Sequence, residues 1–193
     1  MTQPAELQMG RVQVIPAEVV GRAGLIKVQT GEAPAYHDIT DQVARFLEAS
    51  QVTLGQLVVF SKHTTAPIWV NENEPLLQKD MRKFLERVAP RGADYLHNEL
   101  DIRTVNMNPS ECPNGHAHIQ HGFMGGAAAT IPVIGGKLAL GRYQSIFLVE
   151  LDRPRPREVV LQILGLAGAQ EQDNGSLLRP FPPPGEDQPR GPW

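Results

Sequence analysis

The stretch Ala127–Leu164, AAATIPVIGGKLALGRYQSIFLVELDRPRPREVVLQIL, decides the fold class of this chain. It contains four apolar segments of four to eight residues, and the links between them carry Gly, Pro or charged residues. Short segments punctuated in this way are typical of β-strands joined by tight turns. The links are too short for the helical crossover that a parallel pair needs, so the strands are predicted to pair antiparallel.

Further strands are predicted upstream of this stretch. Two apolar runs, Val12–Val20 and Leu25–Thr30, flank residues 21–24, whose two glycines are typical of a hairpin turn. The segment Leu57–Val70 alternates between two faces and is predicted to be extended, and so is the short segment His116–Met124.

Two helices are predicted from apolar residues at helical spacing. The first begins after Asp38, which can cap it, and the second begins at Asn73-Glu74-Pro75. Because these helices and the many strands are partly segregated along the chain, the sequence predicts an α+β fold. We expect a mainly antiparallel sheet or sheet sandwich with the two principal helices packed on one side.

The chain is predicted to form a single domain over residues 9–168. Residues 1–8 are expected to be a flexible N-terminus, and residues 169–193, which contain six prolines, a disordered tail. A chain of 193 residues buries roughly 70% of its unfolded surface, so it needs neither a disulfide nor a metal to stay folded.

Composition excludes several classes of protein. The net charge of −3 gives no overall basic field, so nucleic acid is not an expected partner. The single cysteine, Cys112, cannot form a disulfide within the chain, and the first residues lack a signal-peptide profile. No apolar run is long enough to span a bilayer. We therefore expect a cytoplasmic protein that does not bind membranes.

Histidines are the first candidates for chemistry. On a strand, His116 and His118 would project to the same face about 7 Å apart, a spacing that suits two ligands of one metal ion. His63 and His97 lie in polar segments and could complete a three-histidine centre. A histidine-rich surface strand and hydrogen-bonded structural histidines are the alternatives.

Two acidic residues and an arginine run are further candidates. Asp80 borders the apolar stripe of the second helix, and Glu150 shares a strand face with Ile146. Each could be a buried hydrogen-bonding group or a proton acceptor. In the segment RPRPR, residues 153–157, guanidinium groups alternate with rigid prolines, which suits either a phosphate site or a solvated turn.

An ordered set of short motifs resembles the YjbQ family, formerly the uncharacterised family UPF0047. The motifs are SKHTTA at 61–66, NENE at 71–74, AHI at 117–119, LGRYQ at 140–144 and ELDRPRPR at 150–157. Together with single residues between them, they span nearly all of residues 10–166.

The resemblance implies a compact α+β subunit, a homotrimer and a weak thiamine-phosphate synthase activity. The family's recurrent polar positions correspond here to Ser61, His63, Thr64, Asn71, Glu72, Asp80, His97, His118, Gln144, Glu150 and Arg155. This sequence departs from the family pattern at Tyr143, where Trp is usual, and at His116, where an acidic residue is common.

The leading hypothesis is therefore an enzyme that joins a pyrimidine methyl diphosphate to a thiazole phosphate. Arg155 and Arg157, with a suspected divalent metal such as Zn²⁺ or Mg²⁺, would hold the diphosphate. The pyrimidine would be held by Glu72, Gln144 and Tyr143. The histidines would bind metal or transfer protons. The alternatives are a metal-dependent hydrolase with Glu150 or Asp80 as base, and a non-catalytic trimer that binds a phosphorylated metabolite.

Overall fold

The computed structural model describes residues 18–108 and 111–167, so the predictions for residues 1–8 and for the tail at 169–193 lie outside it. The strands form two antiparallel sheets. The large sheet has the order β1-β8-β3-β5-β6 and the small sheet the order β2-β7-β4. The strands are β1 (Glu18–Gln29), β2 (Ala35–Asp38), β3 (Val52–Ser61), β4 (Ile68–Glu72), β5 (Ala128–Ile134), β6 (Lys137–Leu138), β7 (Gln144–Glu150) and β8 (Pro156–Ala167).

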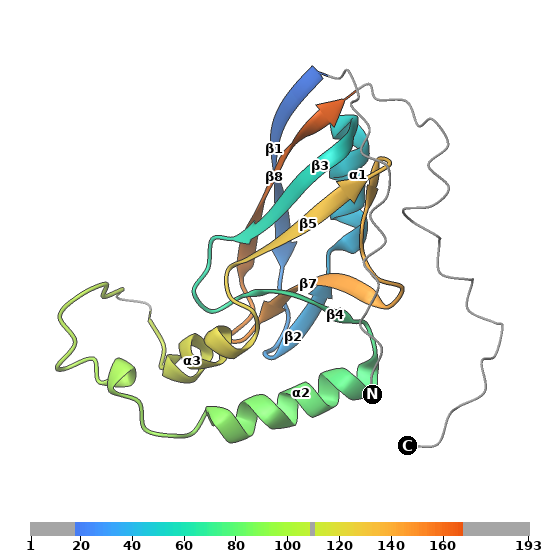
Figure 1. The fold of residues 1–193 in the computed structure, drawn as a ribbon. Coiled ribbons are helices and arrows are strands. Elements are labelled where there is room, and N and C mark those ends of the chain that lie inside the picture. Colours follow the sequence, from blue (N-terminus) through green and yellow to red (C-terminus); the bar gives the residue numbers. More distant parts are fainter. Residues whose placement is uncertain (1–17, 109–110, 168–193) are drawn as a thin grey trace, which may run out of the picture.

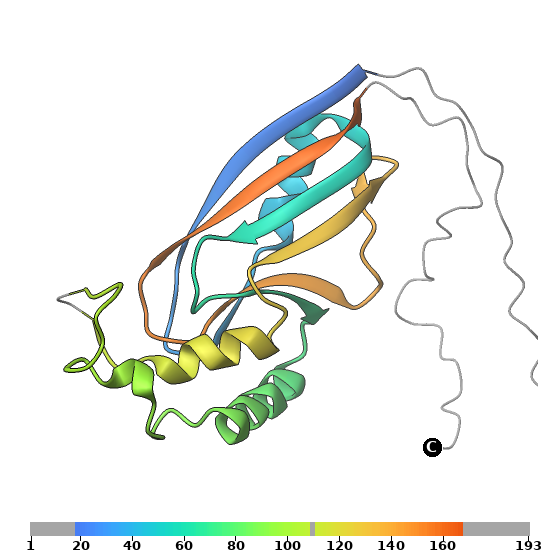
Figure 2. The same cartoon turned by 60° about the vertical axis from the view of Figure 1, so that its left-hand side comes forward.

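Helices complete the fold in two layers. They are α1 (Thr40–Ser50), α2 (Pro75–Val88), the short 3-10 helix η1 (Leu96–Asn98) and α3 (Gly115–Phe123). In Figures 1 and 2, α1 lies behind the large sheet, whereas α2 and α3 lie below the small sheet. The predicted α+β fold with mainly antiparallel sheets is confirmed.

Strand β7 is the centre of the packing because both of its faces are buried. Ile146 and Leu148 join a core with α1 and the large sheet. Phe147 and Val149 point the other way, into a second core with α2 and α3. Alternation along one strand thus serves two cores, and it places Glu150 on the same face as Ile146, as predicted.

The predicted boundaries of both main helices agree with the structure. The Asp38 carboxylate accepts hydrogen bonds from the backbone N–H and the hydroxyl of Thr40, at the start of α1. The Glu74 carboxylate accepts from the backbone N–H groups of Leu76 and Leu77 at the start of α2. Local caps of this kind can be recognised in the sequence.

The predicted hairpin at residues 21–24 is wrong, because β1 runs through them and pairs with β8 without interruption. The glycine that suggested a turn makes room for a side chain instead. A Cβ at Gly24 would lie 2.7 Å from the ring of Phe46 on α1, so only glycine allows this packing.

The predicted strand His116–Met124 is also wrong, since this segment is helix α3. The side-chain oxygen of Asn98 accepts hydrogen bonds from the backbone N–H groups of Asn114 and Gly115 and so caps α3 from a distant segment. No local residue signals this cap. Residues two apart on a helix point to different sides, so His116 and His118 do not share a face.

Candidate functional site

One cavity of about 770 Å³ brings together many of the predicted site residues, and we call it the arginine cavity. It lies among the end of β3, the β7–β8 connection, the segment around η1 and the start of α3. The predicted residues that line it are His63, Thr64, His97, His118, Arg155 and Arg157. Among the described residues, five Lys or Arg side chains and one carboxylate, that of Glu111, line this cavity. The lining is therefore rich in cationic donors, although four of them are ion-paired, with Glu158, Glu111, Asp152 and Glu150.

Arg157 is fixed by a buried ion pair. Its Nε and Nη2 donate to the two oxygens of the Glu150 carboxylate at 2.7 and 2.6 Å. The hydroxyl of Thr30 and the backbone N–H of Asp152 also donate to that carboxylate, at 2.9 and 3.0 Å. With four donors, Glu150 is fully hydrogen-bonded, and it acts here as a positioning residue for Arg157.

Arg155 is held by the buried carboxylate of Asp152, which also accepts a hydrogen bond from the side-chain amide of Asn114. Two atoms in this cluster are buried without a partner among the described residues, the Nε of Arg155 and the Oδ1 of Asn114. Buried polar atoms are normally hydrogen-bonded, so this corner of the cavity has unused bonding capacity.

His63 is fixed by the backbone around it. The ring Nε2 of His63 accepts a hydrogen bond from the backbone N–H of Glu158 at 2.8 Å. The backbone N–H of His63 donates to the Ser61 hydroxyl at 3.3 Å. Burial, followed by the charge of Arg157, lowers the pKa of the His63 ring. His63 is therefore neutral at physiological pH.

His97 and His118, which also line the cavity, form an aromatic pair. Their ring centroids lie 4.6 Å apart. The Nε2 of His97 is 3.6 Å from the Glu111 carboxylate, which Arg103 also binds at 2.6 Å. Burial and the neighbouring His97 lower the pKa of His118. The ring of His118 makes no hydrogen bond to the part of the chain that the structure describes.

Several residues of this site were missed by the sequence analysis, namely Lys62, Arg103, Glu111, Asn114, His121 and Asp152. Arg103 and Glu111 lie in a polar loop with no periodic pattern. The ring of His121 interacts with the backbone of His63, so it supports the site although the predicted strand placed it on the opposite face from His118. The RPRPR run could have indicated Asp152, because a carboxylate beside three guanidinium groups is a natural partner for them.

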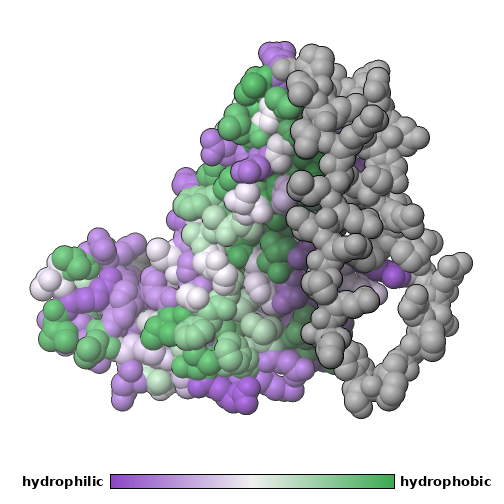
Figure 3. All heavy atoms as spheres, in the orientation of Figure 1, coloured by the Kyte–Doolittle hydropathy of each residue, from purple (hydrophilic) through white to green (hydrophobic). Residues whose placement is uncertain are grey.

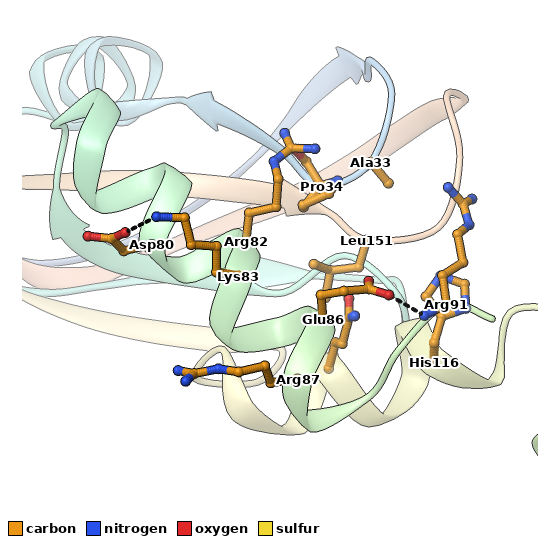
Figure 4. A pocket seen from close by; sticks show the side chains of 11 residues that line it. Ala33, Pro34, Asp80, Arg82, Lys83, Glu86, Arg87, Arg91, His116 and Leu151 are labelled. Carbon is orange, nitrogen blue, oxygen red and sulfur yellow. Dashed lines mark hydrogen bonds and ion pairs between the residues drawn. The ribbon is translucent and has the colours of Figure 1, made fainter. Parts of the chain in front are cut away.

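A second cavity of about 840 Å³ contains Asp80 and His116, and we call it the α2 cavity. It lies between one face of α2, the Ala33–Pro34 turn and the start of α3 (Figure 4). Figure 4 shows Arg82 reaching toward Pro34, whose carbonyl it binds at 2.8 Å, and Asp80 paired with Lys83 on the exposed helix surface.

The remaining predicted residues line neither cavity. Asn71 and Glu72 pair with Ser145 and Gln144 at one end of the small sheet, and Tyr143 lies exposed beside them. Ser61 is buried, and its hydroxyl donates to the carbonyl of Ala66. Within one copy of the chain, the proposed pyrimidine-holding set of Glu72, Gln144 and Tyr143 is therefore separate from the arginine cavity.

The suspected metal ligands His63, His97, His116 and His118 are divided between the two cavities. In the ranges 18–108 and 111–167, no group of three or more His, Cys, Asp or Glu residues is placed to hold a metal ion. His63 also has its Nε2 lone pair engaged by a backbone N–H. No helix in the same ranges is long and apolar enough to cross a membrane.

Comparisons with known proteins agree with this description. The chain is 40% identical to a UPF0047 protein of Methanothermobacter thermautotrophicus over 128 residues, 66% of this chain and 81% of that protein. It is 32% identical to the UPF0047 protein YugU of Bacillus subtilis, over 72% of this chain and 97% of that protein.

Solved structures give the same result. A YbjQ-like protein of unknown function from Sulfolobus solfataricus superposes with a TM-score of 0.68 at 35% identity, covering 77% of this chain and 99% of that one. A hypothetical protein from Aeropyrum pernix gives a TM-score of 0.66 at 36% identity, covering 75% of this chain and 98% of that one. The sequence profile described as UPF0047 protein YjbQ-like matches residues 24–166, and the chain belongs to this family.

Proposed function

We propose that this chain is a transferase of the thiamine-phosphate synthase type. In this reaction a ring nitrogen of a thiazole phosphate attacks the methylene carbon of a pyrimidine methyl diphosphate. A C–N bond forms, the C–O bond to the diphosphate breaks, and the diphosphate leaves with the electron pair. Charge develops on the leaving group, so groups that stabilise a polyphosphate anion dominate the catalysis.

The observation that carries this proposal is the arginine cavity itself. Arg153, Arg155 and Arg157 come from one short segment and line the same cavity. Guanidinium groups match phosphate oxygens with paired N–H donors, and Asp152 and Glu150 hold two of them in fixed orientations. A preorganised cationic cavity loses little energy to rearrangement when the diphosphate forms.

His118 is the best candidate for moving a proton in this cavity. Its ring is half-buried, lies against His97 and is kept neutral by burial, so a ring nitrogen can accept a proton. In the proposed reaction the ring would take up a proton from solvent and then donate it to an oxygen of the departing diphosphate.

The test is a direct assay of the full chain with the two phosphorylated substrates, following thiamine phosphate and diphosphate together. We expect both products in equal amounts and a loss of both in R155A. The matched control is R82A, which removes a similar guanidinium from the α2 cavity and should leave the rate unchanged. Hydrolysis of either substrate alone, with no thiamine phosphate, would contradict the proposal.

A metal-dependent hydrolase is the second candidate, and the contact between His97 and His118 is the observation that favours it. These two imidazoles would supply two ligands of a Zn²⁺ ion, since the described residues place no group of three or more ligating side chains together. Elemental analysis of protein purified without an affinity tag, together with phosphate release from a panel of esters with and without Zn²⁺, tests it. Turnover of esters that requires stoichiometric zinc would favour hydrolysis over transfer.

We also propose that the chain assembles as a homotrimer through the outer face of the large sheet. Val19, Leu54 and Leu166 lie opposite one another on that face, and so do Leu25, Val160 and Phe60. In Figure 3, hydrophobic residues are interspersed with hydrophilic ones over the upper part of the molecule, where β1, β8 and β3 lie. Monomeric proteins rarely expose apolar patches of this kind.

The assembly can be tested with two matched variants. Leu164 on this face and Leu76 on α2 are 62% and 63% exposed. We expect L164K to lower the mass measured by light scattering to that of one chain, and L76K to leave the oligomer intact. A non-catalytic trimeric binding protein would assemble in the same way but return both substrates unchanged.

A further inference from the structure

The orientation of the His63 ring follows from one hydrogen bond. A backbone N–H can only donate, so the Nε2 of His63, 2.8 Å from the backbone nitrogen of Glu158, must be the acceptor. A neutral imidazole has one donor and one acceptor nitrogen, and the proton therefore resides on Nδ1. This tautomer is determined by heavy-atom positions alone.

The surroundings keep the ring in this state. The backbone N–H of His63 is bound to the Ser61 hydroxyl, and His121 interacts with the His63 backbone from α3. Protonation of Nε2 would set two N–H groups against each other, and the adjacent Arg157 opposes a second positive charge. The hydrogen bonds thus fix the position of the ring, and its surroundings keep the ring neutral.

The Nδ1 atom of the His63 ring is available to a ligand in the arginine cavity. His63 lines that cavity, and its Nδ1 makes no hydrogen bond to the described residues. Beside it, Lys62 is paired with Glu158 and Arg157 with Glu150. Arg153 and Arg155 line the same cavity with further N–H donors, so a ligand with negatively charged oxygens is the complementary occupant. A neutral N–H donor of a residue that lines a cavity rich in guanidinium groups suits an oxygen that carries negative charge.

We propose that His63 is a fixed hydrogen-bond donor to a phosphate oxygen in the arginine cavity, through the Nδ1–H of its neutral ring. This role rests on the proposed function only for its choice of a phosphorylated ligand. It separates His63 from the proton-transfer and metal-binding roles, since its one lone pair is already engaged. Of the three histidines at this cavity, only His97 and His118 then remain for such chemistry.

Long-range 15N–1H NMR of the labelled full chain at neutral pH reads the tautomer directly, with the His63 signal identified by its absence in H63N. We expect a neutral ring protonated at Nδ1, and an Nε2–H tautomer or an imidazolium would overturn the proposal. Added Zn²⁺ should leave the signal in place, and a shift in Nε2 typical of metal coordination would also overturn it.

Calorimetric titration with inorganic diphosphate tests the donor role. The amide nitrogen of Asn can replace Nδ1–H, whereas that of Gln reaches the position of Nε2. We expect H63N to bind within about threefold of the wild type, and H63Q and H63A to lose about tenfold or more, as for a hydrogen bond to a charged group. Full binding by H63Q with loss in H63N, or no diphosphate binding by the wild type, would overturn the proposal.

The two proposals can fail separately. If diphosphate binding depends on an Nδ1-type donor but no thiamine phosphate forms, the donor role stands and the transferase reaction is wrong. If thiamine phosphate forms and all three variants bind diphosphate as the wild type does, the transferase stands and the donor role is overturned. Circular dichroism of each variant confirms that the compared proteins are folded.

Discussion

The two cavities of this protein have similar volumes and both border α3, but they are built differently. In the arginine cavity the cations follow strand ends, and two of them are held by buried carboxylates. In the α2 cavity most charges come from one exposed helix face, where Asp80 and Lys83 pair in solvent. Fixed charges favour catalysis, whereas solvated charges contribute little to binding or stability.

Asp152 connects the two cavities. Its carboxylate holds Arg155, and its backbone carbonyl accepts a hydrogen bond from Arg91 of the α2 cavity at 2.6 Å. The α2 cavity also supplies matched controls, because its Asp80, Arg82 and His116 can be compared with Glu150, Arg155 and His118.

The largest expected effect is on stability, in E150A. Removing the carboxylate leaves Arg157 buried with an uncompensated charge, which costs about 3–5 kcal/mol of unfolding free energy. The counterpart D80A, at an exposed ion pair, should change the unfolding free energy by no more than about 0.5 kcal/mol. Urea unfolding measures both free energies. Equal losses would mean that the buried Glu150–Arg157 pair contributes no more to stability than the exposed pair does.

The next effect concerns anion binding. R155A should weaken the affinity for inorganic diphosphate by about 10- to 100-fold, because it removes a charged donor that Asp152 orients. R82A in the α2 cavity should bind diphosphate as the wild type does. A comparable loss in R82A would show that the phosphate site lies in the α2 cavity instead.

A third comparison sets His118 against His116, which a strand would have placed together. H118A should lose ligand binding and activity with a nearly unchanged melting temperature, because its half-buried ring makes no hydrogen bond to the described residues. H116A should lose about 2 kcal/mol of stability, because that ring is buried to 3% exposure, and should keep its ligand affinity. The reverse result would exchange the roles of the two cavities.

The smallest effect is a pH dependence shared by both cavities. Burial lowers the pKa of His63 and His118 in one and of His116 in the other. The unfolded chain then binds more protons, so the unfolding free energy is highest above about pH 6.5 and falls as the pH drops through the lowered pKa values. Urea midpoints at several pH values measure this slope. Constant midpoints would mean that these rings protonate freely in the folded protein.

The sequence predicted most of what depends on local pattern. The strand from Gln144, the alternation that buries Glu150, and the starts of α1 and α2 are all confirmed because their determinants are neighbours in the chain. The RPRPR run indicated the cationic part of the cavity for the same reason.

The errors came from long-range contacts. Helix α3 is capped by Asn98, 16 residues before Asn114, and the space that Gly24 leaves is filled by a residue of α1. No window of the sequence contains both partners of either contact. The prediction that His116 and His118 share a face was wrong because their segment is helix α3. A change from strand to helix alters which residues share a face.

Strand β7 makes the molecule a single cooperative unit. Its two faces belong to different cores, so neither core can open without exposing one face of the strand to solvent. The amides of Phe147 and Leu148 should consequently exchange with solvent only when the whole domain unfolds, among the slowest in the protein. Glu150 ends this strand, so the arginine cavity is anchored to the part of the molecule that opens last.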